Sequence, residues 1–181
     1  MKEISLNILD IAENSVKAGA TLTEITVNET DDTLTLKISD NGCGMTAETL
    51  KAVTDPFYTT RTTRKVGMGL PLLKMEAEQT GGTFDISSRA ESEYPEDHGT
   101  EVTAVFNKKH IDYTPLGDVV SSIVTLIQGH PDTDFLFMHT YGDKSVTLDT
   151  RELRAVLEEV PLNSYEVLKF IEETLRKEEN I

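Results

Sequence analysis

With 181 residues, the chain is long enough for one domain of ordinary size and a small additional region, with a hydrophobic core of its own. Its formal net charge of −15 argues against nucleic acid and anionic membranes as partners, because both would repel an acidic surface. There is no bilayer-length apolar run, no basic-then-apolar leader and only one cysteine, Cys43, which together predict a cytoplasmic protein without an internal disulfide.

Up to residue 109, the predicted helices and strands follow one another in a mixed order. Apolar residues three and four apart indicate helices, strict alternation indicates strands, and glycine or proline marks their ends. The predicted elements are a helix over 4–18, strands over 24–29 and 33–39, a helix from Thr46 to about Asp55, a loop over 57–66, a helix over 67–80, and strands over 83–88 and 100–107. This order predicts an α+β fold with helices on one face of a mixed, mostly antiparallel sheet.

The composition changes after residue 110. Residues 111–181 carry 14 acidic and 6 basic side chains and contain no glycine-rich motif. The predicted elements there are a helix over 116–128, strands over 135–141 and 145–148, a helix over 150–157 that Thr150 would cap, and a helix over 165–177. We interpret this part as a small acidic α/β region that faces a protein partner or forms a homodimer, rather than as a second active site.

Polar residues of the first predicted helix share one face. Asp10, Asn14 and Lys17 are four and three residues apart, so their side chains project in the same direction. Packing does not require a carboxylate and an amide at these positions. The stripe therefore indicates either a polar site or a solvent-facing surface.

The stretch Asp40-Asn41-Gly42-Cys43-Gly44-Met45 directly follows a predicted strand. A carboxylate at a strand end occupies a fixed point on the rim of the sheet, and glycines allow close approach of backbone to a flat ligand. Our working interpretation is that Asp40 accepts a hydrogen bond from the exocyclic amine of adenine. The alternative is an ordinary turn.

A basic segment precedes the helix that starts near Gly67. Arg61, Arg64 and Lys65 lie within five residues of one another in an otherwise acidic chain, and Gly67-Met68-Gly69 then opens the helix. The free N–H groups of a helix N-terminus attract anions. The pattern indicates a polyphosphate site, with a solvated loop as the alternative.

These motifs together resemble those of the Bergerat-fold ATPases, which include DNA gyrase B, heat-shock chaperones, sensor histidine kinases and MutL-type proteins. The stretch from Asp10 to Ala20 resembles the N box in its MutL form, and Asp40–Met45 the first glycine box. The stretches 55–61 and 67–70 resemble the histidine-kinase lid and second glycine box, and Gly99-Thr100 the final Gly-Thr. The resemblance covers residues 4–107, with all motifs in the family's order, and leaves out residues 111–181.

The resemblance implies a two-layer α/β sandwich of the Bergerat type, with Mg-ATP bound by a histidine-kinase-like domain over residues 1–110. It implies that Asn14 binds Mg²⁺ and that Asp40 binds the adenine amine with support from Thr100. The further ATP-binding residues that it implies are Gly42, Gly44, Met45, Gly67, Met68, Gly69 and Leu70 near the base and phosphates, and Arg61, Arg64 and Lys65 at the γ-phosphate.

One position departs from the family pattern. Hydrolysing members place a glutamate base four residues before the metal-binding asparagine, where this chain has Asp10, whose side chain is one methylene shorter. We assign Asp10 as the candidate base. Glu13 is the weaker candidate, because it points about 100° away from Asn14 around the helix.

Three functions are consistent with these residues. The first is a stand-alone kinase that transfers the γ-phosphate of ATP to a separate protein, similar to the small anti-sigma-factor kinases of the superfamily. The others are a slow ATPase and a non-catalytic ATP-dependent switch. A complete sensor kinase is not expected, because the four histidines, at positions 98, 110, 130 and 139, fall in predicted loops and strands rather than on a dimerising helix.

Overall fold

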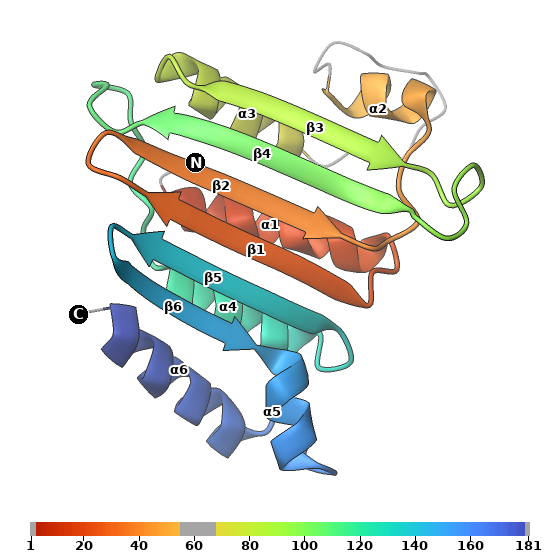
Figure 1. The fold of residues 1–181 in the computed structure, drawn as a ribbon, viewed down its shortest axis with the longest axis vertical. Helices are drawn as coiled ribbons and strands as arrows, with labels where there is room; N and C mark the ends of the chain where they lie inside the picture. Colours follow the sequence, from red (N-terminus) through yellow and green to blue (C-terminus); the bar gives the residue numbers. More distant parts are fainter. Residues whose placement is uncertain (1–2, 55–67, 180–181) are drawn as a thin grey trace.

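A six-stranded sheet forms the frame of the molecule (Figure 1). The structure is a computed structural model that describes residues 3–54 and 68–179. The strands are β1 (Leu22–Glu29), β2 (Thr33–Asp40), β3 (Thr83–Arg89), β4 (Gly99–Asn107), β5 (Asp134–Tyr141) and β6 (Lys144–Asp149). The helices are α1 (Ile4–Lys17), α2 (Ala47–Thr54), α3 (Gly69–Gln79), α4 (Val119–Gly129), α5 (Thr150–Leu157) and α6 (Tyr165–Glu179).

The strands are arranged in the order β3-β4-β2-β1-β5-β6, and most neighbours are antiparallel. The exception is the pair β1 and β5, which run parallel along the whole length of β1. A parallel neighbour needs a crossover connection, and the segment containing α4 provides it between β4 and β5. The predicted α+β fold with a mixed, mostly antiparallel sheet is confirmed.

Three helices cover one face of the sheet. In Figure 1, α1, α3 and α4 lie behind the strands, and α6 lies beside β6 at the lower edge. Strand β2 shows why this face is covered, because Leu34, Leu36 and Ile38 are buried while Lys37, between them, is exposed. Asp40 continues the buried series at the end of the strand, so its side chain points to the helix side of the sheet.

The sheet and its core extend across residue 110. Ile8 of α1, Ile25 of β1, Ile123 of α4 and Phe137 of β5 are fully buried members of one hydrophobic cluster. The sequence interpretation divided the chain at this residue. In the structure, the strands after it lengthen the same sheet, and α4 packs on α1.

After residue 110, one predicted helix start and one predicted helix cap differ from the structure. The helix expected from residue 116 begins at Val119, because Gly117 has φ of +77° and the Asp118 side chain caps the helix by accepting from the Ser121 N–H at 2.9 Å. Asp149, rather than Thr150, caps α5. The Thr150 hydroxyl instead accepts from the Phe135 N–H at 2.9 Å, which joins α5 to the sheet.

Within residues 3–54 and 68–179, no helix is both long enough and apolar enough to cross a bilayer.

Candidate functional site

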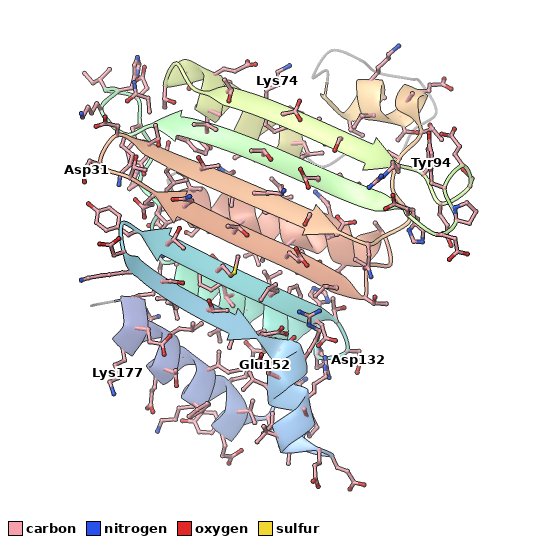
Figure 2. The ribbon with its side chains drawn as sticks, viewed as in Figure 1. Asp31, Lys74, Tyr94, Asp132, Glu152 and Lys177 are labelled. Carbon is pink, nitrogen blue, oxygen red and sulfur yellow. The ribbon has the colours of Figure 1, made fainter. Side chains whose placement is uncertain are left out.

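A row of polar side chains crosses four strands at one end of the sheet. The strand register pairs Ser88 of β3 with Thr100 of β4, Thr100 with Asp40 of β2, and Asp40 with Thr23 of β1. The alternation of the strands directs these four side chains toward the helices. The β3–β4 loop, in which Figure 2 labels Tyr94, lies at this end of the sheet. The same end of the sheet contains a cleft of about 530 Å³, lined by Asp40, Ser88 and Thr100 and also by Ser39, Ser87 and Glu101, which alternate with them and face the other side of the sheet.

Asp40 is positioned by hydrogen bonds on both carboxylate oxygens. Its Oδ2 accepts from the Ser15 hydroxyl of α1 at 2.6 Å, and its Oδ1 accepts from the Gly42 N–H at 2.9 Å. An ionised carboxylate can accept about four hydrogen bonds, so a further donor such as an aromatic amine can still bind. Sequence reasoning gave Ser15 no role of its own and missed this contact.

The glycines of the first glycine box allow close approach within the chain itself. A Cβ on Gly44, which has φ of +61°, would overlap the Arg89 carbonyl oxygen. A Cβ on Gly42 would lie 2.9 Å from the Ala18 Cβ. The sequence interpretation attributed these glycines to approach of a ligand. In the structure, larger residues would also displace the loop from β3 and from the end of α1.

The β3–β4 loop and its flanking residues hold the glycine box in place. The Met45 N–H donates to the Ser88 hydroxyl at 2.8 Å, and this hydroxyl is 2.8 Å from the Thr100 hydroxyl. His98 Nδ1 is 2.6 Å from the Gly42 carbonyl oxygen and must donate, because a carbonyl only accepts. Sequence reasoning assigned no role to Ser88 or His98, and no local pattern distinguishes them from ordinary surface residues.

The two candidate bases on α1 face different neighbours. Asp10 lies against the start of α3, where a Cβ on Gly69 would overlap its Oδ2. Glu13 Oε1 is 2.7 Å from His130 Nε2, just after α4. Asn14 is half-buried and lies one turn beyond Asp10 on the same face of the helix. The structure therefore brings Asp10 against the second glycine box and turns Glu13 toward the C-terminal region.

The second glycine box begins α3. Gly69 is buried, Leu70 packs on the core, and Met68 is exposed. The predicted phosphate-binding residues Arg61, Arg64, Lys65 and Gly67 lie outside the described residues. Among the residues that the structure describes, no group of three or more His, Cys, Asp or Glu side chains could hold a metal ion.

Residues 2–110 match the family described as histidine kinase-, DNA gyrase B- and HSP90-like ATPases. The chain belongs to this family. The match includes both glycine boxes and the α1 face of Asp10 and Asn14, so these elements form the ATP-binding domain typical of its histidine kinases. The predicted family and the ATP-binding character of the domain are confirmed.

Among known proteins, the chain is similar to sensor kinases over about half its length. It is 34% identical to the sensor protein SrrB of Staphylococcus aureus over 93 residues, which is 49% of this chain and 16% of that protein. It is 31% identical to the sensor histidine kinase ZraS of Klebsiella oxytoca over 88 residues, 49% of this chain and 19% of that protein. The chain thus spans less than a fifth of the length of these ATPase-family relatives.

The fold likeness extends further along the chain than the sequence likeness. The ADP-complexed ATPase domain of Aquifex aeolicus MutL superposes with a TM-score of 0.55 over 87% of this chain and 70% of that one, at 15% identity. Because residues 2–110 are a smaller share of the chain than this, the likeness includes part of the C-terminal region. At this identity it supports the fold alone.

Proposed function

We propose that the protein binds Mg-ATP at the strand row and transfers the γ-phosphate to a separate protein, as a stand-alone regulatory kinase. The observation that carries the proposal is the position of Asp10 against Gly69, at the N-terminus of α3. The free N–H groups at that helix end would attract the terminal phosphates, and Asp10 would lie beside them. Phosphoryl transfer depends mainly on positioning and electrostatics, for which a short carboxylate is sufficient.

The donor set suits magnesium as well as the nucleotide. Asp40, already oriented by Ser15 and Gly42, would accept a hydrogen bond from adenine. Asn14 offers a half-buried amide oxygen one turn from Asp10, and Mg²⁺ prefers oxygen ligands that it shares with phosphates and water. Asn14 would therefore hold the metal at the phosphate end of the site.

The positions of the histidines support an acceptor on another molecule. None of the four lies in a helix, and all four are held by contacts within the chain. These contacts join His98 to Gly42, His110 to Asp112, His130 to Glu13, and His139 to Glu29 and Glu179. We therefore place the acceptor of the γ-phosphate on a separate protein.

The C-terminal region offers a surface for that protein. Val156, Val160, Tyr165 and Phe170 are 82%, 49%, 74% and 60% exposed. They lie on or between α5 and α6, at the edge of the sheet far from β3 (Figure 1). Exposed apolar side chains in one region indicate protein contact.

The test is incubation of the purified protein with γ-labelled ATP, alone and with cell lysate. Label on a second polypeptide supports the kinase, whereas free phosphate from the protein alone indicates a slow ATPase. ATP binding without either product indicates a conformational switch. Asp40→Asn serves as the binding-deficient control, and Tyr165→Ser with Phe170→Ser should lose the labelled partner while retaining ATP.

A further inference from the structure

Strand β3 is an open edge of the sheet. It stands first in the order β3-β4-β2-β1-β5-β6, so no strand among the described residues pairs with its outer side. The strand at the other edge, β6, has α6 beside it (Figure 1). Every second residue of an edge strand directs its N–H and C=O away from the sheet, so an open edge can bind a further strand.

The side of β3 that faces away from the helices carries two charges of opposite sign. Its exposed residues alternate with half-buried ones, which include two that pack on the hydrophobic core, Phe84 and Ile86. The exposed residues are Thr83, Asp85, Ser87 and Arg89. Because the strand contains no proline and its two charges offset each other, a strand of matching charge can pair with it.

The spacing of these charges makes the edge complementary to itself. Asp85 lies two residues before Ser87, and Arg89 lies two residues after it. If a second copy pairs antiparallel with β3 about a twofold axis at Ser87, Asp85 of each chain lies directly opposite Arg89 of the other. Opposite charges in this arrangement stabilise a strand pair, whereas like charges destabilise it. No other antiparallel register of β3 on itself brings the two charges together.

Both charged side chains are available for this pairing. Arg89 has a partner in its own chain, because its Nη1 lies 2.6 Å from Oδ2 of Asp97 in the β3–β4 loop. The two side chains are 58% and 69% exposed, so this ion pair contributes little, and the guanidinium has further donors for a second carboxylate. Asp85 forms no ion pair within the part of the chain that the structure describes. Two copies with a net charge of −15 repel each other, but physiological salt screens this repulsion beyond about 8 Å.

We propose that β3 binds β3 of a second copy of the chain, antiparallel, with Asp85 opposite Arg89 across a twofold axis at Ser87. The pairing joins the two sheets at their open edges and covers more of Phe84 and Ile86. It does not depend on the proposed function, and it leaves the exposed apolar residues of α5 and α6 free at the opposite edge of the sheet. A single strand pair buries less area than a permanent dimer needs, so the dimer is weak and concentration-dependent.

The test is sedimentation equilibrium of the purified protein in physiological salt, at concentrations up to about 1 mM. The wild-type mass should rise toward that of a dimer. Asp85→Arg makes both positions positive and Arg89→Asp makes both negative, so each variant alone places like charges opposite each other. Each should raise the dissociation constant at least about tenfold. An equimolar mixture of the two variants should restore the dimer, because every positive position then faces a negative one.

Two further variants make the test specific to this edge. Ser87→Lys places a cation on the axis, where it faces its own copy, and should also weaken the dimer. This variant keeps the proposal testable if Arg89→Asp, which lies beside Asp97, does not fold as judged by circular dichroism. Asp143→Arg is the matched control, because it makes the same change of charge in the exposed turn between β5 and β6. It should dimerise as the wild type does.

Four outcomes would overturn the proposal. A wild type that stays monomeric over the whole concentration range would show that β3 does not bind a second copy. A dimer that persists in Asp85→Arg and Ser87→Lys would be formed by another surface. A mixture of folded Asp85→Arg and Arg89→Asp that stays monomeric would exclude this register. Dissociation of Asp143→Arg would show that the dimer responds to net charge or to the β5–β6 turn instead.

Discussion

Asp40 is already bonded to its own chain before a nucleotide binds, through Ser15 and Gly42. Asp40→Asn replaces one acceptor oxygen by a donor, which must then face the Ser15 hydroxyl, the Gly42 N–H or the adenine amine. We expect ATP affinity to fall by about 1–3 kcal/mol in titration calorimetry. Asp85→Asn, the same change at an exposed position of β3, is the matched control and should leave affinity unchanged. If the Asp40→Asn variant binds ATP with wild-type affinity, Asp40 does not recognise adenine and this part of the proposal is wrong.

Asp10 and Glu13 differ in what they face, although both are acidic residues of the N box. Asp10→Asn should abolish turnover or transfer of the γ-phosphate and leave ATP affinity within about twofold, because the lost interaction belongs to the transition state. Glu13→Gln should retain turnover, since its side chain points to His130. Both are measured by release or transfer of label from γ-labelled ATP. If Asp10→Asn remains active and Glu13→Gln does not, the catalytic carboxylate is Glu13 rather than Asp10.

Helix α6 is joined to the sheet by a histidine between two carboxylates. His139 of β5 lies 3.1 Å from Glu29 of β1 and 2.8 Å from Glu179 of α6, and Lys108 also binds Glu29, at 2.6 Å. Burial alone lowers the pKa of His139, but the hydrogen bonds and charges of Glu179 and Glu29 outweigh it and raise the pKa to about 9. Both ring nitrogens face acceptors, so the ring is a cation that connects three elements.

This arrangement predicts a pH-dependent stability. A pKa raised from 6.5 to about 9 on folding stabilises the protein fully below pH 6.5, and the stabilisation is lost as the pH rises through 9. The difference corresponds to about 3 kcal/mol. Urea unfolding of the wild type should therefore show falling stability between pH 6.5 and 9. His139→Gln should flatten this slope, whereas His110→Gln, in a turn after β4, should preserve it. An equal slope in His139→Gln would exclude this residue as the cause.

At the scale of the whole molecule, the parallel pairing of β1 with β5 makes one folding unit of two regions that differ in composition. We expect a single calorimetric transition for the full chain. Phe137→Ala in β5 should lower the free energy of unfolding by about 3–5 kcal/mol. The single transition should then move to a lower temperature without splitting into two. A fragment of residues 1–110 should lose cooperative unfolding, because β1 becomes an exposed edge and α1 loses α4. Two separate transitions, or a fragment as stable as the full chain, would contradict a shared core.

The start of α1 illustrates how the C-terminal region completes the ATP-binding part. The Glu3 side chain does not cap the helix. The Ile4 and Ser5 N–H groups donate instead to the carbonyl oxygens of Pro115 and Leu116, at 2.9 and 2.8 Å. A helix needs partners for its first N–H groups, and here a segment more than a hundred residues away provides them.

By itself, the sequence determined the elements and the motifs, because both are local. Apolar spacing depends on the period of a helix or a strand, so it predicted α1, the β1–β2 hairpin and even the elements after residue 110 within a few residues. The Asp40–Met45 box and the Asp10–Asn14 spacing were likewise legible, since their residues are neighbours along one strand end or one helix face.

Only the tertiary structure decided which distant groups meet. Ser15 reaches Asp40 across 25 residues, Ser88 reaches Met45 across 43, and Asn7 reaches Glu76 across 69. The sequence also did not predict that β5 pairs in parallel with β1. It suggested instead a boundary between two regions near residue 110. These contacts depend on how helices and strands pack. The local sequence around a serine or an asparagine in a helix does not predict which distant residue it will contact. Packing against the core places α1 between α3 and α4, and this placement turns Asp10 toward Gly69 and Glu13 toward His130.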